Sequence, residues 1–386
     1  MINLTRLYCG IQTPGDSLRY PKKNGNDSKP VVVWTMTRRC NLRCVHCYSD
    51  SGGGFYPGEL TNGEAKEVLK DLASFHIPML LFSGGEPLMH PDFFDLAQYG
   101  SFLGIPMTLS TNGTLIDSGD ARRIKEIGFS YVGISFDGVG EVNDHFRGRK
   151  GSFEAALRGL RYLKKVGQRV GLRFTLTRRN VSSLAQIFDF VKEEGIHRVC
   201  FYHLVYSGRG GILSREDLTK EETRRAMEFI LESTLDLNRD HPEVEVLTVD
   251  NHADGIYLYL KLQKENPKLA QDALRCLRQN GGGAHSSGVG IANIDSCGNV
   301  HPDQFWTDCT LGNVRERPFS QIWSNSNGSI LDGLRHRLPL LKGRCGRCCW
   351  KEICGGSFRV RALQTFGDPW AEDPSCYLSE DEISAK

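Results

Sequence analysis

Short apolar runs recur along the first half of the chain, and each is followed by a longer stretch whose apolar positions are spaced three and four residues apart. The short runs predict buried strands, and the longer stretches predict amphipathic helices that cover them. Strands that alternate with helices in this way are typical of a parallel sheet. The expected strands lie at residues 31–36, 79–82, 107–110, 131–136, 170–177 and 198–205.

Two helix starts are marked by a capping box, in which a threonine and a glutamate three residues later each satisfy a free backbone amide. Thr61 and Glu64 form one such pair, and Thr219 and Glu222 form the other. Six strand–helix units suit an open barrel. We therefore expect an α/β fold, in the form of a partial, TIM-like (β/α)6 barrel.

The composition changes on both sides of this region. Residues 1–30 form an expected N-terminal extension, and the Pro, Gly, Asn, Asp and Ser content of residues 13–30 predicts a loop. The barrel core is expected over 31–240. A polar and then glycine-rich bridging region is expected at 241–285, and a cysteine-rich C-terminal domain at 286–386.

The overall composition excludes several classes of function. The chain has 386 residues, enough for two or more domains, and its formal net charge of +2 gives no electrostatic reason to bind nucleic acid. No apolar run reaches the roughly 20 residues of a membrane span. The N-terminal residues lack the apolar core and small-residue cleavage site of a secretory signal. We expect a cytoplasmic protein.

The thirteen cysteines are the most informative part of the composition. They cluster at the spacing of metal ligands rather than being scattered like a disulfide framework, so we interpret them as reduced and metal-binding. Cys40, Cys44 and Cys47 follow the first expected strand with the spacing C-x3-C-x2-C. Three such thiolates can hold three corners of a [4Fe–4S] cluster and leave the fourth iron open for chemistry. A zinc site that includes His46 is the alternative.

Three further polar motifs follow the next expected strands, where barrels of this kind carry their functional groups. Glycines let the backbone approach a ligand closely, and an adjacent carboxylate can accept hydrogen bonds from an ammonium group. Each motif alone is also an ordinary turn, but their succession behind the cysteine triplet indicates a site. The motifs are Ser83-Gly84-Gly85-Glu86-Pro87, Ser110-Thr111-Asn112-Gly113 and Ser135-Phe136-Asp137-Gly138.

The cysteine triplet, the aromatic residue Tyr48 after it and the three motifs together resemble the radical S-adenosylmethionine (SAM) enzymes. In that family SAM chelates the free iron, and one electron from the cluster cleaves it to methionine and a 5′-deoxyadenosyl radical. For Arg173, a solvated arginine is the alternative to a SAM contact. The resemblance implies SAM contacts from Tyr48, Gly84, Gly85, Glu86, Asn112, Ser135, Asp137 and Arg173.

Four cysteines near the end of the chain resemble the ligands of a SPASM or twitch-like domain, the extension of many radical SAM enzymes that holds auxiliary clusters. The resemblance implies a second [4Fe–4S] cluster with four thiolate ligands and no open iron. Zinc is again the alternative. Cys349 breaks the family spacing and is left out. The four ligands would be Cys345, Cys348, Cys354 and Cys376.

Two positions depart from the full SPASM pattern. The family has a cysteine at the position of Asp303 and another at the position of Phe358, and both belong to a first auxiliary cluster. We infer that this cluster is absent, that two clusters remain, and that Asp303 and His301 face the substrate instead.

Three more cysteines could rebuild the missing cluster, but their spacing does not match the family pattern. They are Cys276, Cys297 and Cys309, and ordinary buried thiols are the simpler interpretation.

Candidate substrate contacts come from two loops rich in Gly and Arg that follow the fourth and sixth expected strands. Arg147 and Arg149 lie in the first loop, and Arg209 lies in the second. Arginine forks bind carboxylates, which indicates an anionic substrate. Solvated surface loops are the simpler alternative.

The segments NLTRLYCG, KPVVVWTMTRRCNLRCVHCYSDS and PGELT resemble the tetrapyrrole-processing branch of the family. The likeness is greatest to the deacetylase type, which removes two acetate side chains from 12,18-didecarboxysiroheme to give Fe-coproporphyrin III. The heme d1 type would remove two propionates from the same compound, and neither spacing nor composition separates the two. The resemblance implies an iron tetrapyrrole substrate, with His203 or His301 as a candidate ligand of its iron, and an electron donor such as flavodoxin or ferredoxin.

Two other classes of function remain open from the sequence. A non-catalytic iron–sulfur carrier would need clusters but not the three SAM-binding motifs. A peptide-modifying radical SAM enzyme would keep them, but the short N-terminal segment and the absent ligands of the first auxiliary cluster count against it.

Overall fold

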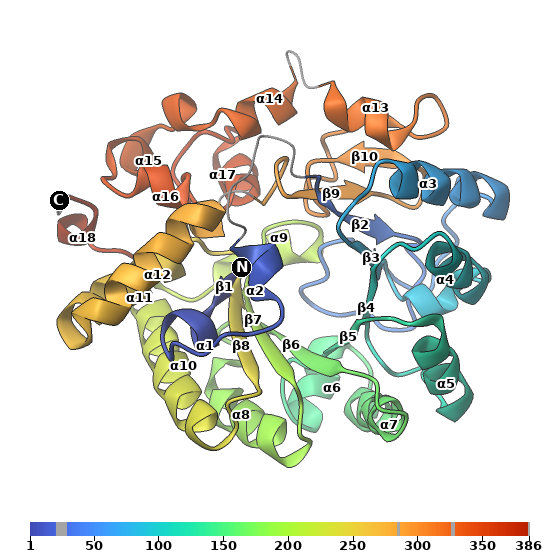
Figure 1. The fold of residues 1–386 in the computed structure, drawn as a ribbon, viewed down its shortest axis with the longest axis horizontal. Coiled ribbons are helices and arrows are strands. Elements are labelled where there is room, and N and C mark those ends of the chain that lie inside the picture. Colours follow the sequence, from blue (N-terminus) through green and yellow to red (C-terminus); the bar gives the residue numbers. More distant parts are fainter. Residues whose placement is uncertain (21–28, 284–285, 326–328, 385–386) are drawn as a thin grey trace.

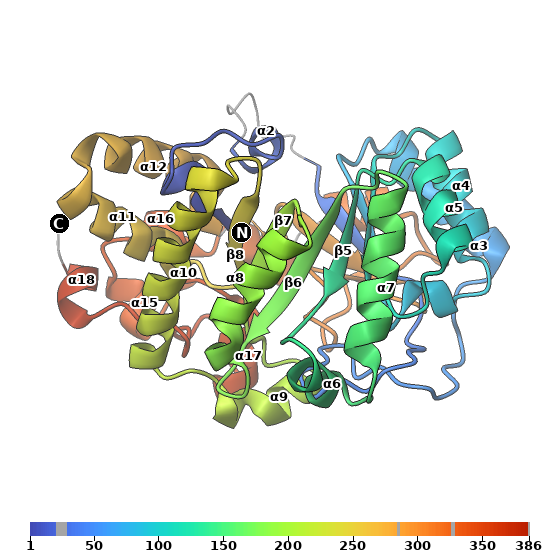
Figure 2. The ribbon, with the colours of Figure 1, turned by 90° about the horizontal axis from the view of Figure 1, so that it is seen from below.

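The computed structural model describes residues 1–20, 29–283, 286–325 and 329–384 (Figure 1). A curved parallel sheet forms its centre, with helices on the outer surface, and Figure 2 shows α7 (Ser152–Lys165), α8 (Leu184–Glu193) and α10 (Lys220–Asp240) running alongside the strands. The strands are β1 (Ile2–Asn3), β2 (Val31–Thr35), β3 (Leu80–Ser83), β4 (Met107–Thr111), β5 (Tyr131–Ser135), β6 (Val170–Leu176), β7 (Arg198–His203), β8 (Glu245–Val249), β9 (Ile291–Ile294), β10 (Asn299–His301) and β11 (Gly312–Asn313).

Many of the remaining helices are short, especially near the C-terminus. They are α1 (Leu4–Leu7), α2 (Asp16–Arg19), α3 (Asn62–Ser74), α4 (Phe93–Phe102), α5 (Ser118–Ile127), α6 (Glu141–Arg147), α9 (Arg209–Leu213), α11 (Ala253–Glu265), α12 (Pro267–Asn280), α13 (Phe319–Ser324), α14 (Ile330–Arg335), α15 (Gly343–Arg347), α16 (Lys351–Cys354), α17 (Arg359–Phe366) and α18 (Glu380–Ser384). Single 3-10 turns are η1 (Pro87–Met89), η2 (Val181–Ser183), η3 (Ser214–Glu216), η4 (Gly281–Gly283) and η5 (Leu338–Leu340).

The six strands expected from the apolar runs are confirmed as β2 to β7, and each pairs in parallel with the next. Their side chains are buried on both faces, because helices cover one face and the barrel interior fills the other. Phe82, Leu109, Ile134, Leu172 and Phe201 are all fully buried. Both predicted capping boxes are present, at the starts of α3 and α10.

The sheet extends beyond the expected core at both edges. Its order is β1-β8-β7-β6-β5-β4-β3-β2-β9-β10-β11, so the barrel is open rather than closed. β8, from the expected bridging region, pairs in parallel with β7, and β1 pairs antiparallel with β8. β9, from the expected C-terminal domain, pairs in parallel with β2. Hydrogen bonding therefore joins segments that the composition divides, and the division into domains remains a prediction.

The ends of the chain are organised around this sheet. α2 lies inside the expected N-terminal loop, of which residues 21–28 lie outside the described residues. Figure 1 shows the orange and red segments, α13 to α17, gathered on one side of the barrel beside β9 and β10. None of the helices in the described ranges combines the length and apolarity that crossing a membrane would need.

Candidate functional site

The cysteine triplet faces a cavity at the C-terminal ends of the parallel strands. It lies in the long loop between β2 and α3. The loops after β3, β4, β5, β7 and β8, the end of β6 and residues 304–305 form the rest of the wall. Motifs far apart in the sequence are thus brought together. The predicted residues that line this cavity are Cys40, Cys44, Cys47, Tyr48, Gly84, Gly85, Asn112, Ser135, Arg147, Arg173, His203 and Arg209.

Nitrogen donors point at all three sulfur atoms of the triplet. Such bonds favour the thiolate form and help to set the potential of an iron–sulfur cluster. Burial raises the pKa of the Cys40 thiol to about 12, so its thiolate needs a cationic centre beside it. This donor set fits a cluster. The bonds are Leu42 N to Cys40 Sγ at 3.4 Å, Ser51 N to Cys47 Sγ at 3.5 Å, and Arg147 Nη1 to Cys44 Sγ at 3.6 Å.

The zinc alternative depends on His46, which lines the same cavity but whose recorded contacts are with other side chains. Its Nε2 lies 3.7 Å from Asp137 Oδ2, and its ring packs against Phe146. Within the described ranges, no three His, Cys, Asp or Glu side chains converge closely enough to share one metal ion, as zinc requires. The corners of a [4Fe–4S] cube need no such convergence, because each thiolate binds a different iron.

The two glycines after β3 are required by the cysteine loop itself. The Gly85 amide donates to Thr37 O at 2.6 Å, and the Glu86 amide donates to Arg39 O at 2.8 Å. A Cβ on Gly84 would lie 2.6 Å from Thr37 O, and a Cβ on Gly85 would overlap Arg39 O. The sequence indicated close approach to a ligand. The structure shows close approach to the neighbouring backbone, which fixes the cysteine loop over the end of β3.

Glu86 is fully buried behind this turn and does not line the cavity. Its carboxylate accepts hydrogen bonds from Thr111 Oγ1 at 2.8 Å, from the Asn112 amide at 2.7 Å and from the Leu88 amide at 3.2 Å. Burial raises its pKa to about 7 against the effect of these donors. Glu86 therefore fixes the loop after β4, which carries Asn112 into the cavity wall.

Asp137 also lies behind the cavity wall. One of its oxygens accepts the Thr175 amide at 2.7 Å, and the other forms a buried ion pair with Arg147. The guanidinium of Arg147 reaches Cys44 as well, so it connects the motif after β5 to a cysteine of the triplet. Arg147 lines the cavity, but part of its charge is already balanced by Asp137.

Arg173 and Tyr48 both belong to the cavity wall. Arg173 comes from β6, donates to Ser110 Oγ, and places its guanidinium 4.8 Å from the centroid of the Tyr202 ring. It is half-buried and faces the cavity, unlike the solvated arginine that was the alternative. Tyr48 packs edge-on against Phe305, with ring centroids 5.0 Å apart. A polar and aromatic surface of this kind can hold an adenosine and a charged amino-acid group.

His203 is the last residue of β7 and is oriented by a buried acid. Its Nε2 lies 3.0 Å from Oδ2 of Asp254, and Oδ1 of Asp254 accepts the Tyr377 hydroxyl at 2.9 Å. All three side chains are buried, and His203 lines the cavity. A histidine held by a carboxylate through one ring nitrogen is the usual arrangement for binding a metal through the other.

Asp250 is a cavity residue that the sequence reasoning missed. It directly follows β8, and Tyr202, which also lines the cavity, precedes His203 at the end of β7. The alternating segment Val244–Val249 could have revealed β8, and the residue after it would then have been a candidate. The expected strands stopped at residue 205, so this signal was not used.

The other predicted substrate arginines are differently placed. Arg209 lines the cavity, but its donors bind Cys44 O at 2.8 Å, Ser51 O at 2.9 Å and Asp50 Oδ1 at 2.6 Å. Arg209 therefore anchors the cysteine loop to the start of α9. Arg149 is exposed, does not line the cavity, and donates to Asn41 O at 3.4 Å.

The four C-terminal cysteines come together around α15 and α16. Burial raises the pKa of the Cys354 thiol well above its usual value, and the nearby charges of Cys376, Cys345 and Cys348 raise it further. The other three thiols are therefore within electrostatic range of Cys354. Arg359 donates to Cys345 Sγ at 3.9 Å, which provides a positive charge beside the group. The set fits four thiolate ligands of one cluster.

The two residues that stand where the SPASM pattern has cysteines, Phe358 and Asp303, both contact neighbouring residues. Phe358 packs edge-on against Phe305, with centroids 5.5 Å apart, in a cluster with Trp306 and Val360. Asp303 accepts hydrogen bonds from the Phe305 amide at 2.7 Å and from Ser287 Oγ.

His301 lies in β10 and is engaged through both ring nitrogens. Its Nδ1 is 2.8 Å from Cys309 O, and its Nε2 is 3.4 Å from Asp295 Oδ2. Neither His301 nor Asp303 lines the cavity. Cys276 lies in α12, Cys297 in the turn between β9 and β10, and Cys309 in the loop after β10.

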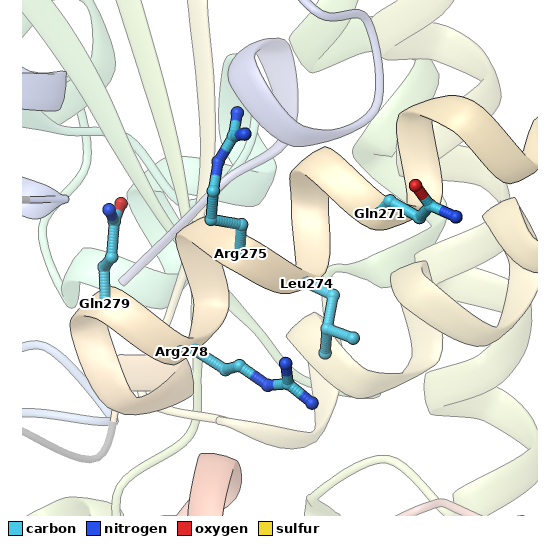
Figure 3. Close-up of a pocket in the computed structure, with 5 residues that line it drawn as sticks. All are labelled: Gln271, Leu274, Arg275, Arg278 and Gln279. Atoms are coloured by element: carbon cyan, nitrogen blue, oxygen red, sulfur yellow. The ribbon is translucent and has the colours of Figure 1, made fainter.

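A separate surface groove runs along α12 (Figure 3). Its walls are exposed and partly buried side chains of one helix, and it contains none of the predicted site residues. It is lined by Gln271, Leu274, Arg275, Arg278 and Gln279. This groove contributes nothing to the site at the strand ends.

Comparison with known proteins agrees with the fold. Residues 34–191 match the Radical SAM superfamily. The chain is 50% identical to the Fe-coproporphyrin III synthase of Methanosarcina barkeri, over 99% of both chains. The chain belongs to the radical SAM enzymes, in the family that includes this synthase.

A second relative is almost as similar. The pre-heme d1 synthase of Dinoroseobacter shibae is 47% identical over 92% of this chain and 87% of its own. An AdoMet-dependent heme synthase of Methanosarcina barkeri is 32% identical over 90% of this chain and 95% of its own.

Solved structures share the fold at much lower sequence identity. Streptococcus suis SuiB, bound to S-adenosylmethionine, superposes with a TM-score of 0.69 at 17% identity, over 91% of this chain and 78% of that one. The enzyme anSMEcpe with bound AdoMet gives a TM-score of 0.67 at 19% identity, over 90% and 94% of the two chains. At this identity the likeness concerns the fold alone.

Proposed function

We propose that this enzyme removes the two acetate side chains of 12,18-didecarboxysiroheme and gives Fe-coproporphyrin III. The observation that carries the proposal is the 50% identity to an Fe-coproporphyrin III synthase along essentially the whole of both chains. A cavity that combines three cluster cysteines with a carboxylate-oriented histidine supports it, because the substrate contains iron.

The residues expected to contact SAM fall into two groups by their position relative to the cavity wall. Tyr48, Gly84, Gly85, Asn112, Ser135 and Arg173 would contact SAM directly, since they line the cavity. Glu86 and Asp137 would act from behind the wall, by fixing the loop after β4 and the guanidinium of Arg147. When bound, the cluster held by Cys40, Cys44 and Cys47 and its SAM supply a 5′-deoxyadenosyl radical that takes a hydrogen atom from the substrate.

A second cluster would be held by Cys345, Cys348, Cys354 and Cys376. The electrostatic influence of the other three thiols on Cys354 and the adjacent Arg359 support this assignment. With four thiolate ligands such a cluster has no open iron, so its role would be the transfer of single electrons. A one-electron donor such as flavodoxin or ferredoxin would supply them.

Among the candidate substrate contacts, His203 has the best position. It lines the cavity, and Asp254 holds its Nε2, which leaves Nδ1 to bind the substrate iron. His301 is the weaker candidate because Cys309 O and Asp295 engage both of its ring nitrogens.

Arg147 and Arg209 would add positive charge around a substrate with several carboxylates, although other groups already bind them. Arg149 and Asp303 would contribute only from outside the wall.

Removal of two propionates, as in heme d1 biosynthesis, is the second candidate reaction. It is favoured by the 47% identity to a pre-heme d1 synthase, which differs little from the similarity to the first relative. A peptide substrate has weaker support, since the SuiB and anSMEcpe structures resemble this chain only in fold.

One anaerobic experiment distinguishes these reactions. The reconstituted enzyme is incubated with SAM, dithionite and 12,18-didecarboxysiroheme, and the tetrapyrrole is analysed by mass spectrometry. Loss of two acetate arms is expected, and loss of two propionate arms would transfer the enzyme to the heme d1 reaction. An unchanged tetrapyrrole with 5′-deoxyadenosine still formed would contradict both. Cys44→Ala serves as the control, and it should form neither product.

A further inference from the structure

Asp250 has an unusual backbone for a residue with a side chain. Its φ is +67°, in the left-handed region that L-amino acids seldom occupy, although Asp and Asn tolerate it best. Such conformations persist only where surrounding structure enforces them, and they concentrate in active sites. The strain at Asp250 is located at the C-terminal end of a barrel strand, where enzymes of this architecture carry catalytic groups.

The residues on both sides of Asp250 are firmly held. Val249 is paired with Tyr202 in the sheet. Asn251 is buried, donates to Ser375 O at 3.0 Å, and accepts from Ser357 Oγ at 3.2 Å. This anchoring enforces the backbone turn and directs the carboxylate into the cavity with the cysteine triplet.

Asp250 is the only carboxylic acid among the described residues that line this cavity. Within the described ranges its carboxylate makes no hydrogen bond, in contrast to Glu86 and Asp137, whose oxygens are engaged behind the wall. A carboxyl group that makes no hydrogen bond and is open to the substrate is available to exchange a proton.

The charges around Asp250 keep both protonation states accessible. Burial raises its pKa to about 6, and the N-terminal amine, Arg361, Arg173 and His203 act in the opposite direction. The charge of Asp250 in turn acts on Tyr202 in β7 and on Asp303 in the loop after β10, and raises the pKa of both. Near neutral pH such a group can give up a proton and recover it from solvent.

We propose that Asp250 is a catalytic residue that protonates the two-carbon fragment as it leaves the substrate. The assignment rests on the proposed function. After hydrogen abstraction from the macrocycle, homolysis of the bond between the ring carbon and the CH2–COO⁻ arm leaves a ring double bond and a carboxymethyl radical. That fragment becomes acetate by gaining one electron and one proton. A one-electron donor of the iron–sulfur class supplies the electron, and Asp250 supplies the proton.

The main alternative is that the fragment takes a hydrogen atom back from 5′-deoxyadenosine. In that case no electron is consumed, no acid is needed, and the new hydrogen of acetate does not come from solvent. The two routes therefore differ in the isotope that acetate acquires in D2O.

The test measures released acetate by mass spectrometry after turnover of the full reconstituted enzyme in D2O. The wild-type enzyme is expected to give acetate with one deuterium. Asp250→Asn, which tolerates the same backbone conformation, should lower the acetate formed per 5′-deoxyadenosine by about a hundredfold. Asp250→Glu keeps the acid and should recover part of this ratio. Asp120→Asn, on α5 outside the cavity, controls for loss of a carboxylate elsewhere.

Three results would overturn the assignment, and they identify different failures. Acetate without deuterium would exclude a solvent-exchangeable donor but leave the proposed function intact. Deuterated acetate with an unchanged ratio in Asp250→Asn would assign the proton to another group. A tetrapyrrole that loses no acetate, while 5′-deoxyadenosine is formed, would overturn the proposed function itself.

Discussion

Arg147 shows how one side chain can adjust the chemistry of a cluster. Its guanidinium lies between the Cys44 sulfur and the Asp137 carboxylate, and it is buried with both. A cation and a hydrogen-bond donor beside a thiolate stabilise the more negatively charged, reduced state of an iron–sulfur cluster. Asp137 opposes part of this effect, so the balance between the two residues sets the potential.

We expect Arg147→Met to lower the reduction potential of the SAM-binding cluster. A tenfold lower ratio of reduced to oxidised cluster at fixed ambient potential corresponds to a shift of about 59 mV. An anaerobic redox titration followed by electron paramagnetic resonance measures this shift. Arg147→Lys keeps the charge and should fall between wild type and Arg147→Met, while the exposed Arg149→Met should have no effect. Equal potentials in all four proteins would remove Arg147 from this role.

His203 gives a prediction that can be tested without turnover. We expect His203→Ala to weaken binding of the iron tetrapyrrole and to change its absorption spectrum, because the iron loses a nitrogen ligand. Asp254→Asn should produce a smaller change of the same kind, since orientation of the ring is lost but the ring remains. Added imidazole should restore the spectrum of His203→Ala. His241→Ala, beyond the end of α10, is the control, and a wild-type spectrum in His203→Ala would contradict the assignment.

At the scale of elements, the apolar runs were sufficient to predict β2 to β7. Each is a short run of buried residues with helices on either side, which is the pattern that the sequence shows most clearly. β8 to β11 were not predicted. β9, β10 and β11 are only two to four residues long and are polar in part, and they exist because they pair with each other and with β2. The pairing of β9 with β2 spans about 260 residues of sequence and leaves no local signal.

The places of the site motifs at the strand ends were also predictable, but the contacts that their side chains make were not. The sequence placed Glu86 and Asp137 at the ends of β3 and β5, and the structure puts them there. That both lie behind the wall depends on partners from other strands, Asn112 and Thr175. Sequence order alone does not reveal such partners.

The turn after β3 allows a matched pair of substitutions. Gly85→Ala would push a Cβ into Arg39 O, and overpacking of this kind costs about 1–3 kcal/mol of unfolding free energy. It should also displace the cysteine loop and lower the iron content. Gly63→Ala, on α3 with nothing within 4 Å of the new Cβ, should be neutral or stabilising by up to about 1 kcal/mol. Urea unfolding and iron analysis measure both effects, and equal stability of the two variants would show that the close approach is dispensable.

At the scale of the whole molecule, the C-terminal segment is fixed to the barrel by buried polar contacts as well as by the sheet. Arg361 and Asp373 form a fully buried ion pair, and Arg361 also donates to Leu204 O just after β7. Buried charges are tolerated when each is paired and hydrogen-bonded. The four C-terminal cysteines are therefore held at a fixed position relative to the cavity.

Removal of one of these cysteines tests the second cluster. We expect Cys354→Ala to lose about four irons per chain and to keep cleaving SAM, because the cysteine triplet is untouched. Iron analysis and 5′-deoxyadenosine formation with dithionite are the measurements. Cys349→Ala, next to the set but outside the family spacing, should keep its iron. Unchanged iron content in Cys354→Ala would leave the enzyme with a single cluster.

The pairing of β9 with β2 has a consequence for synthesis of the chain. β2 is made early, and its outer edge is covered only when Ile291–Ile294 have been translated, about 250 residues later. At roughly 5–20 residues per second, ribosomes need on the order of 10–50 s to make that segment. During this interval β2 has an unpaired edge directly before the cysteine loop, which invites strand addition from other nascent chains. Insertion of the catalytic cluster should therefore follow synthesis of β9, and yield in a heterologous host should respond to chaperone supply as well as to iron.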